Sequence, residues 1–164
     1  MPEFLYIARH AWAGSFGDPG WPNDSLRELE PEGIERYERV IELLADRGLA
    51  PEVIATSPYI RCRQTAEIMA AGVAGNPEVV ELEALTPGSD FEAVVEWSRP
   101  YSGSSIAWVG HAPDVGLMTS AVIGQGRSHI RFAKGSIAAI QLFDEIDYSS
   151  GELYWHTTAK SLGV

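Results

Sequence analysis

Two short segments of the chain each place a histidine just after a run of apolar residues. Arg9 and His10 directly follow Phe4–Ala8, and His111 follows Ser105–Val109 with only Gly110 between them. A neutral imidazole nitrogen is a competent nucleophile, and guanidinium groups hold phosphoryl oxygens with charge-assisted hydrogen bonds. If these side chains meet in space, His10 can act as a nucleophile on an anion held by Arg9.

A third segment adds another cation to the same set. The helix predicted from near Tyr59 to about Ala71 carries Arg61 in its first turn, where amide groups and the helix dipole favour an anion. Gln64 lies three residues further on, so it can share a face with Arg61 and is a second candidate for substrate binding. The alternative is that Arg61 is an ordinary solvated helix residue.

These residue types together predict metal-independent phosphoryl transfer. Nearby arginines disfavour the imidazolium form and keep His10 neutral, while His111 and the arginines stabilise charge on the equatorial phosphoryl oxygens. Water then hydrolyses phospho-His10. The rival use of two histidines is a metal site, which needs further ligands nearby, whereas here the neighbours are arginines that repel a cation. We therefore expect no metal and no cofactor.

A proton donor to the leaving group is harder to identify. The loop after the third predicted strand carries the two carboxylates worth considering, Glu83 and Asp90. Asp90 suits the N-cap of a helix over Phe91–Ser98 better than an acid role. Glu83 is therefore the candidate donor.

Alternating strands and helices must position these residues. Strands separated by helices predict an α/β fold of three αβα layers around a mostly parallel sheet, in which strand ends meet at one edge. The last two strands are joined by a turn-rich segment, which indicates an antiparallel hairpin at the sheet edge. The predicted strands are Phe4–Ala8, Val53–Thr56, Pro77–Leu82, Ser105–Val109, Ser136–Phe143 and Gly151–Thr157, and the helices open near Glu30, Tyr59, Phe91 and Pro113.

Length and composition narrow the class of protein. The 164 residues suit one domain, spanning 1–164, and the net charge of -11 argues against a general nucleic-acid or anionic-membrane surface. No apolar stretch approaches the roughly 20 residues that span a bilayer, and no signal-peptide pattern opens the chain. The single cysteine, Cys62, excludes an internal disulfide and fits a reducing compartment, so we expect a cytoplasmic protein.

Two connecting segments are left open by the sequence. The segment from Ala11 to Leu29 is long and rich in Gly and Pro, as functional or mobile loops often are. The segment from Gly124 to Lys134 is polar and basic, with Arg127, His129 and Arg131. It is either a rim for a phosphorylated substrate or a solvated connection.

The motifs now assembled resemble the histidine phosphatase superfamily (phosphoglycerate mutase-like). They are Arg9-His10, Ser57-Pro-x-x-Arg61-x-x-Gln64-Thr65-Ala66 and Gly110-His111, and the resemblance spans nearly the whole chain. The short length leaves no room for a large inserted cap domain, which is similar to the small SixA-type phosphohistidine phosphatases. The resemblance implies that His10 carries the phosphohistidine intermediate, with Arg9, Arg61 and His111 as the phosphate pocket. Ala11 departs from the Gly found there in many members.

The resemblance therefore implies a phosphatase whose substrate is phosphohistidine in a protein. A phosphoramidate leaving group needs less help from an enzyme acid than an alkoxide does, so an uncertain acid fits this substrate. Two alternatives stay open: a small-molecule phosphomonoesterase, for which Glu83 would matter, and a non-catalytic phospho-binding regulatory module. The expected partner is a phosphorylated protein or a small phospho-compound.

Overall fold

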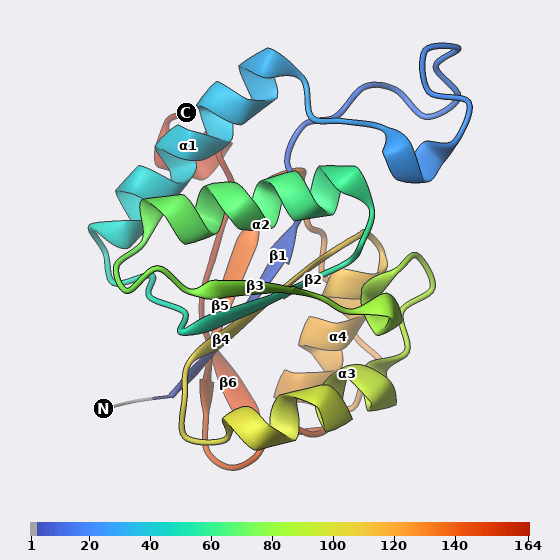
Figure 1. The fold of residues 1–164 in the computed structure, drawn as a ribbon. Coiled ribbons are helices and arrows are strands. Elements are labelled where there is room, and N and C mark those ends of the chain that lie inside the picture. Colours follow the sequence, from blue (N-terminus) through green and yellow to red (C-terminus); the bar gives the residue numbers. More distant parts are fainter. Residues whose placement is uncertain (1–2) are drawn as a thin grey trace.

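A six-stranded sheet lies between two layers of helices in the computed structural model, which describes residues 3–164 (Figure 1). The strand order is β3-β2-β4-β1-β5-β6; β1 to β4 run parallel, whereas β5 and β6 form an antiparallel edge. This confirms the predicted three-layer α/β fold. The strands are β1 (Phe4–Arg9), β2 (Val53–Thr56), β3 (Glu78–Glu81), β4 (Ile106–Gly110), β5 (Ile137–Leu142) and β6 (Gly151–Thr157), and the helices are α1 (Pro31–Ala45), α2 (Ile60–Gly72), α3 (Phe91–Ser98) and α4 (Asp114–Ile123).

Alternation along the central strands builds a separate core on each face of the sheet. In β1, Tyr6 and Ala8 join the core under α1 and α2, whereas Leu5 and Ile7 join the core under α3 and α4. Successive side chains of a strand point to opposite faces, so a buried central strand must be apolar at every position. Trp108 of β4 is fully buried, which confirms that this strand is central.

The bounds of two helices differ from the predicted ones by one or two residues. The first helix, which the apolar spacing predicts to run to Arg47 with Gly48 as its stop, ends at Ala45, and Gly48 adopts a left-handed conformation with φ +100°. Glycine adopts this conformation without a Cβ penalty, so it is suited to the turn that leads into β2. The prediction that Pro113 is the first helical residue is wrong, because Pro113 is the N-cap and α4 begins at Asp114.

The register between β1 and β4 brings the two histidines together. Arg9 pairs with Gly110, so the residues that follow them, His10 and His111, leave the sheet side by side. The backbone N–H of His10 donates to Gly110 O at 3.0 Å. The segment that leads to α2 leaves β2 at the same edge, where Ser57 N–H donates to Val109 O at 3.0 Å.

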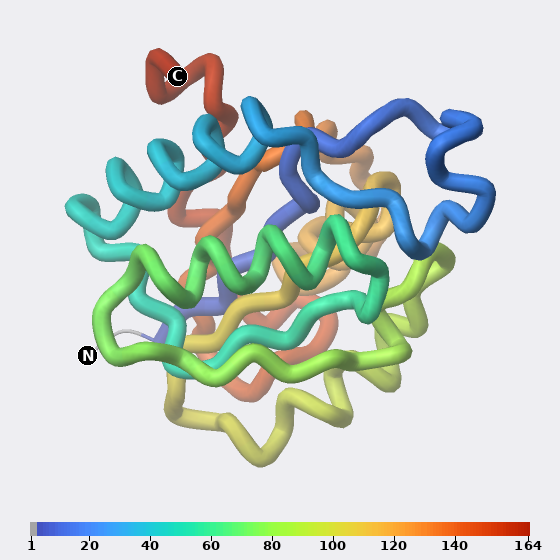
Figure 2. Tube along the Cα trace, turned by 45° about the horizontal axis from the view of Figure 1, so that its top comes forward, coloured from blue at the N-terminus to red at the C-terminus, as the bar shows by residue number. Residues whose placement is uncertain are grey.

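The long segment after β1 is more ordered than the sequence predicts. It contains a 3-10 helix, Asp24–Leu26, and an isolated bridge between Ala13 and Leu29. Its blue trace lies beside the N-terminal end of α2 (Figure 2). The backbone N–H of Leu29 donates to the Gln64 side chain at 2.8 Å, which ties the end of this segment to α2.

No large cap domain is inserted between the strands of residues 3–164, as the short chain predicts. Each parallel strand is followed by one α-helix of 8 to 15 residues, and short 3-10 helices lie between β1 and α1 and on either side of α3. None of the helices in this range combines the length and apolar character that crossing a membrane requires. The edge of the sheet where β1, β2 and β4 end is therefore not covered by a separate domain.

Asp90 caps α3, as the sequence predicts, with its Oδ1 accepting from Ala93 N–H at 3.1 Å. We expect Asp90→Ala to lower the free energy of unfolding by about 1 kcal/mol, the usual effect of losing an N-cap. Asp90→Asn keeps an acceptor and should stay close to native. Urea unfolding measures both changes, and phosphatase activity should be unchanged in each; a large activity loss in Asp90→Asn would instead show that this carboxylate takes part in the reaction.

Candidate active site

His10 and His111 lie next to each other in a buried cluster at the carboxyl ends of β1 and β4. Their ring centroids are 5.6 Å apart, and both side chains are at most 5% exposed. His10 Nδ1 lies 2.7 Å from Ala11 O. A carbonyl oxygen only accepts, so Nδ1 carries the proton and Nε2 keeps its lone pair. No hydrogen bond within residues 3–164 engages Nε2, so that nitrogen is free to react.

Both histidines are held neutral. Burial lowers the pKa of His10 to about 3, with smaller contributions from Arg61, His111 and Arg9 and an opposing one from the hydrogen bond to Ala11. Burial likewise lowers the pKa of His111 to about 3, followed by the effect of Arg61. The sequence-based prediction is that nearby arginines keep His10 neutral. In the structure the arginines contribute, but burial lowers the pKa more than they do.

Arg61 is buried and not a solvated helix residue, so that alternative is wrong. Its side chain is 5% exposed, with Nη2 at 3.4 Å from His111 Nδ1. Nη1 donates to Asp24 O at 2.9 Å, and Nη2 donates to Asp24 Oδ2 at 3.0 Å. A buried guanidinium held at two points is a fixed cation, which is what binding a phosphoryl group requires.

Asp24 and Arg27 belong to this network, although no sequence motif marks them. Arg27 Nε donates to Asp24 Oδ1 at 3.0 Å, and Arg27 Nη1 donates to Gly14 O. Burial raises the pKa of Asp24, but Arg61 and Arg27 together outweigh it and hold that pKa below its ordinary value. The only sequence signal is an Asp and an Arg three residues apart in a polar loop, a spacing too common to single out.

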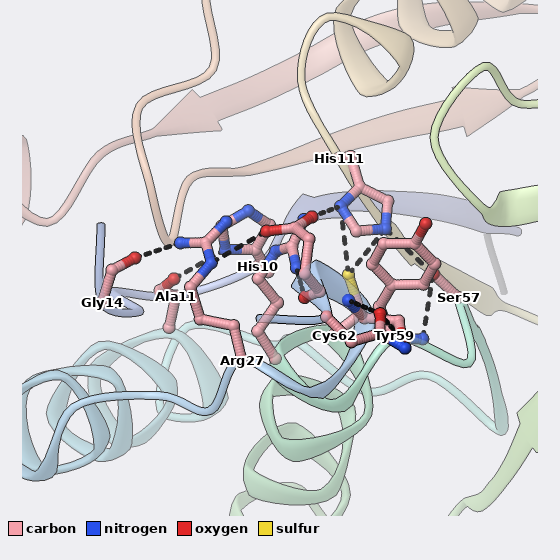
Figure 3. A network of polar contacts seen from close by, with 12 residues as sticks. His10, Ala11, Gly14, Arg27, Ser57, Tyr59, Cys62 and His111 are labelled. Carbon is pink, nitrogen blue, oxygen red and sulfur yellow. Dashed lines mark hydrogen bonds and ion pairs between the residues drawn. The ribbon is translucent and has the colours of Figure 1, made fainter. Parts of the chain in front are cut away.

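Side chains from α2 and the segment before it fix the ring of His111. His111 Nε2 lies 2.9 Å from Ser57 Oγ, and Cys62 Sγ lies 3.5 Å from the same nitrogen (Figure 3). The Tyr59 ring meets the imidazole edge-on at 5.0 Å between centroids. Burial raises the pKa of Cys62 to about 12, so this thiol is protonated and packs as an apolar group.

Arg9 lies at the side of the cluster. Its Nη1 donates to Phe132 O at 2.8 Å, and within residues 3–164 it makes no hydrogen bond to His10, Arg61 or His111. Two buried donors, Arg9 Nε and Arg61 Nε, have no acceptor among these residues. Buried N–H groups are nearly always paired in folded proteins, so these two are exceptions within the described residues.

Two predicted groups make no hydrogen bond to the cluster. Gln64 Oε1 accepts from the backbone N–H of Leu29, and within residues 3–164 Gln64 makes no hydrogen bond to the histidines or arginines, so its role in substrate binding stays a prediction. Glu83 is exposed at the start of the 3-10 helix after β3, and no described contact links it to the cluster.

The two neutral histidines predict a loss of stability in acid. Each has a pKa of about 3 when folded and an ordinary value of 6.5, so the unfolded chain binds more protons below pH 6.5. The free energy of unfolding should therefore fall as pH falls from 6.5 toward 3, by at most about 1.4 kcal/mol per pH unit for each histidine.

Urea unfolding across this window measures the effect. The fall should be shallower in His10→Ala and unchanged in His129→Gln, because His129 is exposed. The same slope in His10→Ala as in the native protein would contradict the buried, neutral state of His10.

Comparison with known proteins places the chain in a family. Residues 5–86 match the family model of the histidine phosphatase superfamily (branch 1). An uncharacterized protein of Picosynechococcus sp. (strain ATCC 27264 / PCC 7002 / PR-6) is 34% identical over 142 residues, 84% of each chain.

Two solved structures share the fold over nearly the whole chain. The protein histidine phosphatase SixA complexed with tungstate has a TM-score of 0.83 at 23% identity, covering 97% of this chain and 99% of its own. A structure from Agrobacterium tumefaciens assigned as phosphohistidine phosphatase SixA has a TM-score of 0.76 at 25% identity, covering 96% and 99%. The chain therefore belongs to the histidine phosphatase superfamily (branch 1), as a phosphatase with the fold of the small SixA proteins.

Proposed function

We propose that the protein hydrolyses phosphohistidine in a protein substrate through a covalent phospho-His10 intermediate, without a metal ion. The observation that carries the covalent route is the state of His10: Nδ1–H is bound to Ala11 O, and Nε2 is free on a neutral ring. A nucleophilic imidazole needs this tautomer, because only the unprotonated nitrogen has a lone pair to donate. Arg61 and His111 beside it supply groups that bind phosphoryl oxygens.

In the first step, His10 Nε2 attacks phosphorus in line with the bond to the leaving nitrogen. The P–N bond breaks as the Nε2–P bond forms, and its electron pair stays on the leaving imidazole nitrogen. Arg61 carries positive charge at a fixed position, and its Nε and that of Arg9 have no acceptor among residues 3–164. Both guanidinium groups therefore stabilise the negative charge that spreads over the phosphoryl oxygens in the transition state.

In the second step, water attacks the phosphorus of phospho-His10. The Nε2–P bond breaks, its electron pair returns to Nε2, and the proton of the water leaves with the phosphate product. The Ser57 hydroxyl lies 2.9 Å from His111 Nε2 and can donate to it, which leaves the proton of the neutral ring on Nδ1, where it can donate to a phosphoryl oxygen in both steps. The enzyme then regains the same tautomer of His10 that begins the cycle.

The ionised state of the carboxylate in the site favours a phosphoramidate substrate over a phosphate ester. Among residues 3–164, Asp24 is the one carboxylate in contact with the cluster, and Arg61 and Arg27 keep it ionised. An ionised carboxylate cannot donate the proton that an alkoxide leaving group needs. Phosphohistidine can take a proton on its other ring nitrogen and leave as neutral imidazole. The SixA structures with the same fold are named as phosphohistidine phosphatases, which supports the same substrate class here.

Rapid-quench labelling tests the proposal. We expect a labelled phosphoramidate to leave acid-labile, base-stable label on His10, and phosphohistidine peptides to turn over faster than aryl or alkyl phosphate esters. Glu83→Gln should change the turnover of phosphohistidine peptides and of esters by no more than about twofold, because Glu83 lies outside the group of residues that react. Ester turnover that exceeds phosphoramidate turnover and collapses in Glu83→Gln would favour a small-molecule phosphomonoesterase. Phosphate binding without label or turnover would favour a non-catalytic binding module.

A further inference from the structure

A basic groove of about 520 Å³ lies beside the active-site cluster. Four separate parts of the chain form it: the end of β1 with the following loop, α1, the segment before β5, and the turn after β6. Each part contributes at least one cation, and an aromatic ring forms part of the wall. The residues that matter here are Arg9, Trp12, Arg36, Arg131, Lys134 and Lys160.

The groove concentrates positive charge in a strongly acidic protein. Five of the 12 lysines and arginines line it, although the chain carries 23 acidic residues and a net charge of -11. Within residues 3–164, none of the five forms an ion pair with an Asp or Glu side chain, whereas Arg27, Arg61, Arg63 and Arg99 all do. Like charges gathered without partner Asp or Glu side chains repel one another, so the arrangement is costly unless an anion binds there.

The groove is linked to the active site through the backbone. Arg9 lines the groove and directly precedes His10 in the chain. The segment that carries Lys134 is bound to the nucleophile's own backbone, since Gly135 N–H donates to His10 O at 3.0 Å. A chain that presents a phosphorylated side chain to His10 can therefore lie in this groove.

The walls of the groove are held in place on one side. Arg36 stacks over the Trp12 ring at 4.2 Å and donates from Nη2 to Val164 O at 3.0 Å. A Cβ at Gly135 would lie 2.9 Å from the same ring, so glycine lets the indole pack tightly against the segment before β5. The indole is therefore a rigid surface between the cations, of the kind that anchors protein contacts.

We infer that this groove binds an acidic stretch of the protein substrate next to its phosphorylated residue; the inference rests on the proposed function. Arg36, Arg131 and Lys160 are exposed residues with long side chains. Exposed charges of this kind select and steer a charged macromolecular surface, whereas small-ligand sites enclose their ligand with a few fixed polar groups. The same argument assigns the segment 124–134, whose role the sequence leaves open, to the substrate rim at Arg131 and Lys134.

Binding of a short fluorescent peptide rich in Asp and Glu to the full chain tests the inference without needing turnover. The matched peptide has Asn and Gln at the same positions. We expect the acidic peptide to bind at least about tenfold more tightly, with a preference that shrinks as salt is added. Arg131→Glu with Lys134→Glu should remove that preference. Arg127→Glu is the matched control, because Arg127 is exposed on the same segment but does not line the groove.

Each outcome separates this inference from the proposed function. The groove assignment would be overturned if the two peptides bound equally tightly. It would also be overturned if the Arg131→Glu and Lys134→Glu double variant kept the preference for the acidic peptide, or if Arg127→Glu lost it to the same extent. Binding of inorganic pyrophosphate but not of the acidic peptide would overturn it in favour of a small-anion site. If a small phosphoramidate labels His10 normally but the acidic and neutral peptides bind equally, the proposed function stands and the groove assignment fails. If the acidic peptide binds more tightly but no label appears on His10, the proposed covalent mechanism fails and the groove still binds an acidic peptide.

Discussion

His10→Ala should abolish turnover and the covalent intermediate together. The variant has no imidazole to attack phosphorus, so kcat/KM should fall by at least about 10⁴-fold, the range seen when a nucleophile is removed. No acid-labile label should appear after rapid quenching. Binding of inorganic phosphate should persist, because Arg61 and His111 remain in place.

Two controls make this prediction specific. His129→Ala removes an exposed histidine and should keep native activity and labelling. The fold of His10→Ala should also survive, since the histidine is neutral and the backbone bonds of β1 do not depend on its side chain. Residual labelling of the His10→Ala protein would place the intermediate on another residue and refute the assignment.

Arg61→Ala should cause the second-largest loss. Arg61 is a buried cation whose Nη2 lies 3.4 Å from His111 Nδ1, and its removal takes away fixed positive charge from the transition state. Losing one such group typically lowers kcat by about 10²- to 10³-fold. Arg61→Lys keeps a charge but loses the planar fork, so it should recover only part of the activity.

Arg63 provides the matched control on the same helix. It lies two residues further along α2, is exposed, and pairs with Glu67 and Glu81. Arg63→Ala should therefore stay within about twofold of native activity, as exposed ion pairs contribute little. Steady-state kinetics and competitive inhibition by phosphate measure both variants. If kcat fell equally in Arg61→Ala and Arg63→Ala, the loss would come from the change in overall charge and not from a contact of Arg61 with the phosphoryl group.

The sequence by itself determined the layer architecture and the edge of the sheet that carries the site. Apolar runs and helix-ending residues report local burial and turns, so they located every strand and α-helix to within a few residues. The placement of His10, Arg61 and His111 after neighbouring strands followed from the rule that parallel strand ends meet at one edge.

Only the tertiary structure decided which side chains touch. The pairing of Asp24 with Arg61 joins residues 37 positions apart, and the pairing of Gln64 Oε1 with Leu29 N–H joins residues 35 positions apart. Burial of the two histidines sets their pKa values more strongly than the arginines do, and burial is a property of the packed molecule. The basic groove likewise draws on four separate segments. Local patterns in a sequence fix conformation over a few residues, whereas contacts between distant segments depend on register and packing, which exist only in the folded chain.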